Sequence, residues 1–408
     1  MNTGAYKFHL PWLLLGILPV GLGAKTVPPI PTPANGMTPL AEWFPKAPPL
    51  PKPKGEIVRV GNVDDLFEAV RKVKPGGTIL VDDGLYHLPR FLDIRTDRVG
   101  LRSASGNRNA VILDGGKARL GELVGVTKCT GVTIADLTIQ NVKWNGFKIN
   151  SDLGADKETI HNCVIRNVWQ RGIKAPAMPK AKGHLGPEDC RIQYCLFFNS
   201  RPKEFSDDET EKPNRYNGNY IGGIDVKNTR NWTISDNVFI GIHGRTREGR
   251  AAIYISENGR DCMIERNVFL DCDIAIALGN PSLGYSPLQA INCVVRDNLI
   301  FHAPETGILA CYTKDCRIEG NTIHDPASRF RRLIWVQNSN EGLVLKDNLL
   351  SPWPVKVTGK SKITQEGNEV LKELVGDEKV GQKHLPRKTA EEAMQLAQEY
   401  WEVNRLEK

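Results

Sequence analysis

WTISDNVF (residues 232–239) is a short motif that recurs four more times along this chain of 408 residues. The other copies are CMIERNVF (262–269), CVVRDNLI (293–300), CRIEGNTI (316–323) and LVLKDNLL (343–350). Their asparagines follow one another at intervals of 30, 31, 23 and 27 residues. A motif that returns at such intervals indicates a repeat architecture, in which each unit buries its apolar face against its neighbours.

Apolar and polar residues alternate within each copy, in the two-residue period of a strand with one buried face. No helical pattern of about ten residues separates the copies, so the strands are not joined by crossover helices. Short strands that stack every ~20–30 residues without helices predict a solenoid of about ten coils, the parallel β-helix.

Aligning the copies also aligns two columns of side chains in the predicted core. One column contains Cys190, Trp232, Cys262, Cys293, Cys316 and Leu343, and the other contains Cys195, Asn237, Asn267, Asn298, Asn321 and Asn348. Stacked asparagines hydrogen-bond to one another at the spacing of strands. We predict that the cysteines are small buried hydrophobic residues, because parallel side chains do not meet the geometry of a disulfide.

With these columns the chain resembles the right-handed parallel β-helices of the pectate-lyase-like superfamily, whose members often carry asparagine and cysteine columns. The resemblance implies an all-β fold with short helical caps at both ends. A helix is predicted from Asn62 to Val73, with Asn62 as its N-cap, and it would cover the open end of the first coil. This helix and the Pro75-Gly76 turn after it resemble the opening of the alginate-lyase/chondroitinase-B family.

Four segments are predicted along the chain. Residues 1–24 combine a short positive region with an apolar stretch and a small-residue end, which is typical of a secretory signal peptide. Residues 25–55 are rich in proline and predict an extended linker. The β-helix domain follows at 56–360, and 361–408 is a C-terminal capping segment with a helix that opens at Thr389. We therefore expect a secreted protein, periplasmic or extracellular, with no membrane span after signal removal.

The charge of the chain bears on its partners. The formal net charge is +7, and no block of lysine and arginine is interleaved with aromatic residues. We therefore expect no nucleic-acid partner. A modest positive charge is compatible with an acidic polysaccharide as partner, and we expect the protein to be a monomer.

Each coil should contain a second strand before the asparagine motif, and the residues between its apolar members should face solvent. Insertions at 176–188 and 201–220 should wall this face into a cleft, because insertions in solenoids gather on the binding face. His243 is expected at the surface of a loop. The catalytic candidates are Lys227, Arg250, Arg245 and Tyr254, and the substrate-binding candidates are Lys148, Lys174, Asn150, Asp225, Ser256, His243 and Arg247.

A face rich in lysine and arginine favours lyase chemistry. A polysaccharide lyase needs a base for the proton next to a uronate carboxylate, and cations that neutralise the developing charge. Neighbouring cations would also lower the pKa of a lysine toward that of a base. A glycoside hydrolase instead needs two carboxyl groups about 5 to 9.5 Å apart. The face offers only Asp225, so hydrolysis would require a loop acid, which could be Asp207, Asp208 or Glu209.

The stretch Lys227-Asn-Thr-Arg-Asn231 matches the turn in which the alginate-lyase/chondroitinase-B family places its catalytic lysine. The resemblance implies that Lys227 is the base, and Arg245 and Arg250 would neutralise the carboxylate. The family has Arg-His-Gly on the next coil, where this chain has Glu257-Asn-Gly, and Asp225 is all that is left of its calcium-binding acidic pair. No metal ligand is assigned, no cofactor is certain, and Ca²⁺ stays open.

The leading prediction is a secreted lyase that cleaves an acidic, uronate-containing glycan by β-elimination. The alternative is a non-catalytic glycan-binding or cell-surface protein, in which Lys227 is an ordinary solvated lysine of a strand. A glycoside hydrolase or an epimerase is a further alternative. The fold alone does not choose among these functions.

Overall fold

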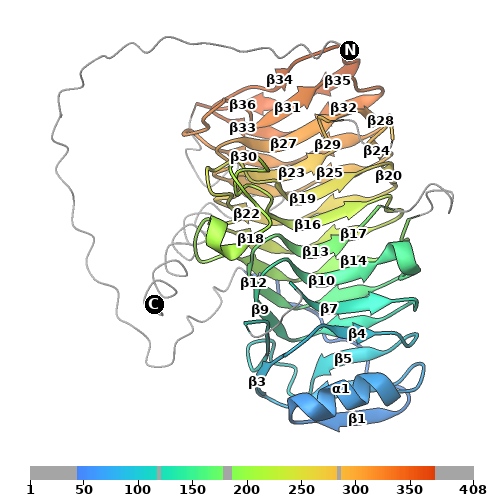
Figure 1. Cartoon of the computed structure of the whole chain (residues 1–408). Helices are drawn as coiled ribbons and strands as arrows, with labels where there is room; N and C mark the ends of the chain where they lie inside the picture. The colour runs from blue at the N-terminus through green and yellow to red at the C-terminus, as the bar shows by residue number, and fades with distance from the viewer. Residues whose placement is uncertain (1–43, 117–120, 178–185, 283–285, 373–408) are drawn as a thin grey trace, which may run out of the picture. The chain divides into compact units, whose positions relative to one another are not determined.

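The computed structural model describes residues 44–116, 121–177, 186–282 and 286–372. The predicted signal peptide and the predicted helix at 389–402 lie outside these residues. The described chain is a right-handed parallel β-helix, as predicted, with three long sheets in which every strand pair is parallel (Figure 1). Among the described residues, no helix is long and apolar enough to cross a membrane.

Sheet A has twelve strands and includes the first half of each repeated motif. Its strands are β1 (Ile57–Val60), β2 (Thr78–Val81), β5 (Gly100–Ser103), β8 (Thr133–Ala135), β11 (Thr159–His161), β14 (Arg191–Gln193), β17 (Thr233–Ser235), β21 (Met263–Glu265), β25 (Val294–Arg296), β29 (Arg317–Glu319), β32 (Leu343–Lys346) and β35 (Ile363–Glu366).

Sheet B has eleven strands, which begin just after the asparagines of the motif. They are β3 (Gly84–His87), β6 (Val111–Asp114), β9 (Thr138–Val142), β12 (Val164–Val168), β15 (Leu196–Phe198), β18 (Val238–Ile240), β22 (Val268–Leu270), β26 (Leu299–Phe301), β30 (Thr322–His324), β33 (Leu349–Ser351) and β36 (Glu369–Val370).

Sheet C has ten strands, the predicted second strand of each coil. They are β4 (Leu92–Ile94), β7 (Glu122–Thr127), β10 (Asn145–Asn150), β13 (Arg171–Ala175), β16 (Gly222–Lys227), β19 (Ala251–Ser256), β23 (Ile274–Leu278), β27 (Thr306–Cys311), β31 (Ile334–Gln337) and β34 (Lys356–Val357). A short fourth sheet joins β20 (Gly259–Arg260), β24 (Ala290–Ile291) and β28 (Thr313–Lys314).

The chain passes from sheet A to sheet B to sheet C and back to sheet A. The described residues therefore complete ten coils, from β2–β3–β4 to β32–β33–β34, which confirms the predicted number. Strands β35 and β36 continue sheets A and B beyond residue 360, where the sequence predicted the β-helix to end. That boundary is corrected, because the pairing persists after the recognisable motif has faded.

The two predicted interior columns are confirmed. Each asparagine amide donates to the next asparagine Oδ1 at 2.9 to 3.0 Å from Asn237 to Asn348, and Asn348 extends the column to Asn368 at 2.8 Å. All nine cysteines are buried free thiols. Burial raises the pKa of the Cys129 thiol to about 12, and enclosed thiols such as this one are inert packing groups.

Helix α1 (Val63–Lys72) lies at the start of the first coil, at the lower end of Figure 1. Asn62 is its N-cap, as predicted, because its side chain accepts a hydrogen bond from the backbone of Asp65 at 2.9 Å. Leu66, Ala69 and Val70 of the helix are buried in the same core as the strands. The helix thus covers the open end of the solenoid, as expected.

The end of the proline-rich stretch is not a free linker. Phe44 is buried, the Pro48 carbonyl lies 3.1 Å from the His161 ring, and the Pro51 carbonyl accepts from Arg102 at 2.9 Å. Pro48 and Pro51 thus lie against the outer side of sheet A, and Phe44 packs with apolar residues of sheet B. The expectation of a spacer over all of 25–55 is therefore corrected for its final part.

Candidate functional site

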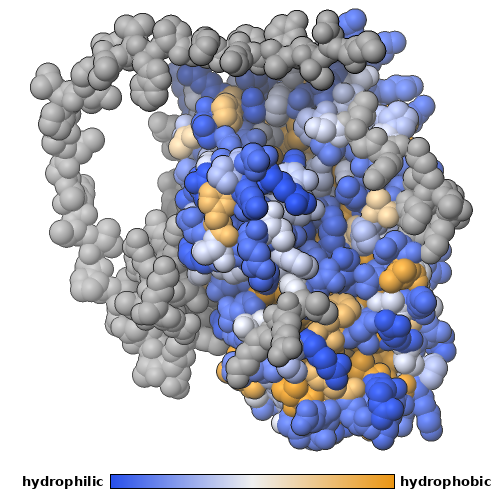
Figure 2. Space-filling model, in the orientation of Figure 1, coloured by the Kyte–Doolittle hydropathy of each residue, from blue (hydrophilic) through white to orange (hydrophobic). Residues whose placement is uncertain are grey.

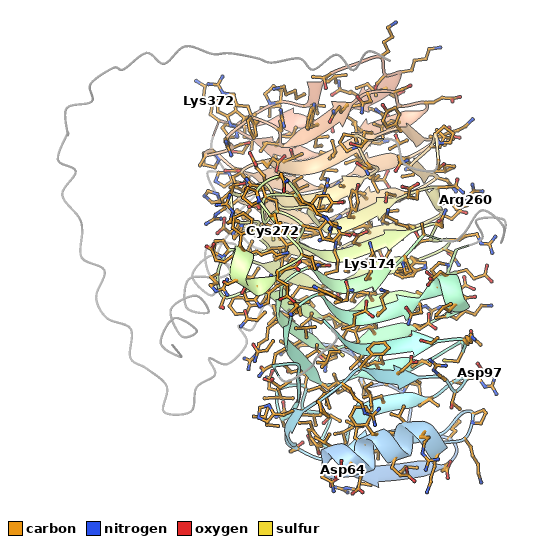
Figure 3. All side chains as sticks on the ribbon, in the orientation of Figure 1. Asp64, Asp97, Lys174, Arg260, Cys272 and Lys372 are labelled. Carbon is orange, nitrogen blue, oxygen red and sulfur yellow. The ribbon has the colours of Figure 1, made fainter. Side chains whose placement is uncertain are left out.

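The outer face of sheet C carries the residues that the sequence selected for chemistry. Strand register places Lys148 beside Lys174, Lys174 beside Asp225 and Asp225 beside Tyr254, so this predicted central column is confirmed. Lys174 lies on β13 in the middle of the sheet (Figure 3). Hydrophilic residues predominate over this middle part of the face in Figure 2.

The central column is much less exposed than expected. Asp225 is 2% exposed and Tyr254 is 7% exposed, and Ser256 beside them is fully buried. The insertion at 201–220 accounts for much of this burial, since the Tyr220 ring lies 3.8 Å from the guanidinium of Arg171 and stacks on Tyr216. The predicted cleft wall is therefore a cover that packs directly on the sheet.

Beneath Tyr220, two cations converge on one carboxylate. The Arg171 Nε and the Lys174 Nζ both lie 2.7 Å from Asp225 Oδ2, and the side chains of Arg171 and Asp225 are almost completely buried. The other oxygen of that carboxylate, Oδ1, is buried and accepts no hydrogen bond from the described residues. A buried acceptor without a partner costs free energy, so Oδ1 is an unsatisfied acceptor within this cluster.

Burial and pairing shift the pKa values in this cluster. Burial would raise the pKa of Asp225, but Lys174 and Arg171 outweigh it and hold the pKa well below its usual range. Burial lowers the pKa of Lys174, although Asp225 opposes this effect. Burial also raises the pKa of Tyr254, more than nearby Arg250 lowers it, so the phenol keeps its proton at neutral pH.

The cluster carries an excess of positive charge. Arg171 and Lys174 share the single counter-charge of Asp225, and Arg250 adds a further cation near Tyr254. The Arg250 guanidinium lies 5.8 Å from the Tyr216 ring, so the insertion also contacts this residue. Buried cations in excess of their counter-charges favour an anionic ligand.

The neighbouring coils below this cluster are electrostatically balanced. Lys148 Nζ pairs with Glu122 Oε1 at 2.7 Å, and the Asn145 amide donates to the same oxygen at 2.9 Å. Asn150 donates to Thr127 Oγ1 at 2.8 Å. Lys148 and Asn150, both predicted to bind substrate, are thus already held by protein partners.

Lys227 lies at the far end of β16. Its Nζ is 3.7 Å from Glu257 Oε1, and register aligns it with Ser256. The backbone of Arg250 bonds to Ile221, six residues before Lys227, at 2.9 Å. Six residues of strand span about 20 Å. The prediction that Lys227 and Arg250 act together on one bond is therefore corrected, because they lie at opposite ends of the neighbouring strands β16 and β19.

The turn from residue 241 to 250 is anchored and not freely solvated. His243 is fully buried, with its Nδ1 2.6 Å from Asp273 and its Nε2 3.1 Å from Asp271. Burial lowers the pKa of His243, but the two aspartates outweigh it and the net pKa is raised. The prediction of a surface histidine is wrong, because Asp271 and Asp273 enclose the ring and nothing in the local sequence marks this contact.

Arg245 and Arg247, two of the three arginines of this turn, also have protein partners. Arg247 Nη1 lies 2.7 Å from the Nε2 of His243 and 3.3 Å from Asp271. Arg245 donates to the side chain of Asn217 at 2.6 Å and lies over the Phe205 ring at 4.5 Å. Arg245 thus holds the turn against the insertion at 201–220, and Arg247 binds it to His243 and Asp271. The structure therefore gives both arginines an architectural role.

The later coils give the outer face of sheet C a different character. Ala277, Leu309 and Cys311 are buried in one apolar cluster that also includes Tyr254, and Trp335 packs against it. The guanidinium of Arg332 lies 3.7 Å from the Trp335 ring. The face is therefore charged around Asp225 and apolar above Tyr254.

Sequence reasoning missed Arg171. Period-two alternation would point it inward with Ile173, but Gly172 faces the core, because a Cβ there would lie 2.9 Å from Phe197. The strand therefore has two successive inward residues, and Arg171 points outward. A recurring signal marks this arrangement, since a glycine or alanine precedes the first apolar residue of the strand in successive coils, as at Gly146 and Ala252.

The loop acids that hydrolysis would require are engaged elsewhere. Asp207 forms two hydrogen bonds of 2.6 Å with Arg201, and Glu209 pairs with Lys143 at 2.9 Å. Asp208 is buried with Lys203 and accepts hydrogen bonds from Trp144 and Gln170. The contacts of Asp208 and Glu209 fasten the insertion to earlier coils, whereas the Asp207 pair lies within the insertion. None of the three acids is left to face Asp225 across a substrate.

No group of three or more His, Cys, Asp or Glu side chains is placed to hold a metal ion in the described ranges. Copper is bound mainly by thiolate, thioether and imidazole ligands. The thiols of this chain are enclosed in the solenoid, and His243 is occupied by two aspartates. The described residues therefore do not fit a copper site.

Comparison with known proteins supports the class that the fold defines, the right-handed parallel β-helix proteins. The family model described as "Periplasmic copper-binding protein (NosD)" matches residues 191–352, which run from β14 to just past β33. No match to a curated protein sequence is found.

Solved structures of the same fold include, by their names, a protein in complex with a saccharide and an alginate lyase. A tailspike protein double mutant of E. coli bacteriophage HK620, in complex with a pentasaccharide, is 11% identical with a TM-score of 0.51, and the match covers 78% of this chain and 59% of the tailspike chain. An alginate lyase from Paenibacillus sp. str. FPU-7 is 11% identical with a TM-score of 0.39, over 77% of this chain and 99% of the lyase. Such likeness establishes the fold alone.

Proposed function

We propose that the outer face of sheet C binds an acidic glycan and cleaves it by β-elimination. The observation that carries this proposal is the buried cluster in which Arg171 and Lys174 share Asp225 and leave positive charge in excess beside Tyr254. A uronate carboxylate would supply the missing negative charge. The apolar surface above Tyr254 would pack against the carbon face of a neighbouring sugar.

In this proposal the reaction divides among residues of adjacent coils. Neutral Lys174, whose pKa burial lowers, takes the proton from the carbon next to the uronate carboxylate. The electron pair of that C–H bond forms the new carbon–carbon double bond as the glycosidic C–O bond breaks. The Tyr254 hydroxyl, whose pKa is raised, gives its proton to the leaving oxygen. Arg171 and Arg250 neutralise the carboxylate throughout.

Non-catalytic binding of an acidic glycan is the second candidate. Lys174 is held 2.7 Å from a carboxylate, an arrangement that favours its charged form and would prevent it from acting as a base. This contact specifically favours binding without cleavage. Either function suits the secretory signal predicted at residues 1–24, and secretion is part of the proposal.

The test is incubation of the purified full chain with a panel of uronate polysaccharides, following absorbance of the unsaturated product. Tyr254→Phe should lower kcat by about 10²–10⁴-fold while binding persists, because one proton donor is lost. Tyr86→Phe is the matched control, since Tyr86 is also buried but bonds to the Asp82 carbonyl in the first coil. Binding without product would select the second candidate, and absence of binding would overturn both.

A further inference from the structure

A stripe of apolar side chains lies on the outer face of sheet B, where a solvated sheet would carry polar residues. Strand register aligns its members across five strands, from β12 to β26 (Figure 1). The members are Val164, Leu196, Phe198, Val238, Ile240, Val268, Leu270, Leu299 and Phe301. The stripe is bounded by polar strands, with Thr138 and Gln140 before it and Thr322 and His324 after it.

These nine side chains are buried although they point away from the core of the solenoid. None is more than 7% exposed. Phe44 is the one further member of their cluster in the described part of the chain, so no second apolar segment of that part covers the stripe. An apolar surface of this extent marks an interaction site, and its cover has to come from residues outside the described ranges or from another molecule.

The C-terminal sequence has the pattern that fits this stripe. Ala393, Leu396, Ala397 and Tyr400 are spaced as one face of an amphipathic helix, and Thr389 opens a capping box before them. A helix over 389–402 would be about 21 Å long. Five strands of a sheet span about 19 Å. The helix and the stripe therefore match in length.

The chain between β36 and residue 389 is also long enough to reach the stripe. Strand β36 is three strands from β26 in sheet B, which is about 14 Å. Residues 373–388 would reach up to about 50 Å when extended. The end of the solenoid, in contrast, shows no cover, since Val357 and Val370 are 42% and 47% exposed. These exposures speak against a helix that caps the last coil.

We infer that residues 389–402 fold back as an amphipathic helix and dock on the apolar stripe of sheet B. The helix seals the face of sheet B and does not cover sheet C. The C-terminal segment is thus a strap along the side of the coils, in place of the end cap that the sequence suggested. The inference is independent of the proposed function, because it rests on a different sheet.

Photo-crosslinking in the full chain tests this docking directly. Phe198 and Phe301, at the two ends of the stripe, are each replaced by p-benzoylphenylalanine, and the adduct is mapped by mass spectrometry. Both positions should crosslink within the same chain to residues 389–402, because the helix spans the stripe. The same replacement at Leu85, an exposed position of sheet B in the first coil, should give no such adduct.

The segment itself supplies the second variant and its control. Leu396→Asp should reduce the adduct at least tenfold, because a buried charge would cost more than 1.4 kcal/mol. Gln395→Asp, one residue away on the polar side, should leave it unchanged. Neither variant alters the solenoid. Adducts in residues 1–43 or in a second copy of the chain, or no adduct at either position, would overturn the inference.

Discussion

Between β12 and β26, sheets B and C belong to the same coils but present different outer faces. Sheet B presents nine apolar side chains in two columns, whereas sheet C presents Arg171, Lys174 and Asp225 before it becomes apolar above Tyr254. The interior side chains of the coils stack in the same way beneath both faces, as the Phe197, Phe239 and Phe269 rings do. The repeat thus constrains the core and leaves each outer face free to acquire its own partner.

The largest effect is expected when the charged cluster of sheet C loses the carboxylate of Asp225. Asp225→Asn should lower the free energy of unfolding by about 3–5 kcal/mol, because Arg171 and Lys174 lose their shared counter-charge while buried. Denaturant unfolding measures this change. Asp236→Asn is the control, because its partner Arg266 is exposed and the pair should contribute less than about 1 kcal/mol. Equal losses in the two variants would show that the Asp225 cluster is solvated.

The next effect concerns the apolar face. Leu270→Ala should cost about 2–3 kcal/mol, because a side chain in the middle of the covered stripe is fully buried. Leu85→Ala should change stability by less than about 0.5 kcal/mol, since Leu85 is on the outer face of the same sheet but exposed. Thermal and denaturant unfolding of the two variants measure the loss of stability in each. A loss of similar size at both positions would mean that no segment covers the stripe.

The third effect concerns a buried acid, Glu158, whose contribution to stability depends on pH. Burial raises the pKa of Glu158 from 4.5 to about 7, and its carboxylate accepts from the Asp156 backbone at 2.8 Å. The folded state therefore binds this proton more tightly than the unfolded state. Its stabilising effect is complete below pH 4.5 and is lost as the pH rises through about 7.

Glu158→Gln removes this titration. The difference in unfolding free energy between the variant and the natural protein should grow by up to about 1.4 kcal/mol per pH unit between pH 4.5 and 7, in favour of the variant. Unfolding curves at several pH values measure it. A difference that stays constant over this range would contradict the raised pKa.

The smallest effect is expected at Lys227, at the C-terminal end of β16. Lys227→Met should change the unfolding free energy by less than about 1 kcal/mol, because its ion pair with Glu257 is 3.7 Å long and partly solvated. Denaturant unfolding again supplies the measurement. A loss of 3 kcal/mol or more, which is the range of a broken buried pair, would make Lys227 part of a buried cluster like that of Asp225.

The sequence could predict the features that recur in every coil. The spacing of Asn237, Asn267 and Asn298 fixes the register of every strand, so the column from Lys148 to Tyr254 and the buried cysteines followed from alignment alone. Register is set by period-two alternation around one continuous core, and this physical constraint acts on each coil.

The sequence could not predict how the insertion covers the outer face of the coils. The insertion at 201–220 has no period, and its anchors are long-range pairs such as Lys143 with Glu209 and Arg171 with Tyr220. These contacts turned a supposedly exposed face into a largely buried one and brought two aspartates to His243. Arg171 escaped notice because Gly172 breaks the alternation on which the inward and outward assignment depended.

The most direct test of the central claim is calorimetric titration of the full chain with a uronate oligosaccharide and with the same oligosaccharide after reduction of its carboxyl groups. The excess cations beside Tyr254 should bind the acidic form at least tenfold more tightly than the neutral form, because each desolvated charge pair is worth more than 1.4 kcal/mol. Arg250→Gln should reduce the difference in affinity between the acidic and the neutral oligosaccharide. Equal affinity for the two forms, or no binding of either, would contradict the account.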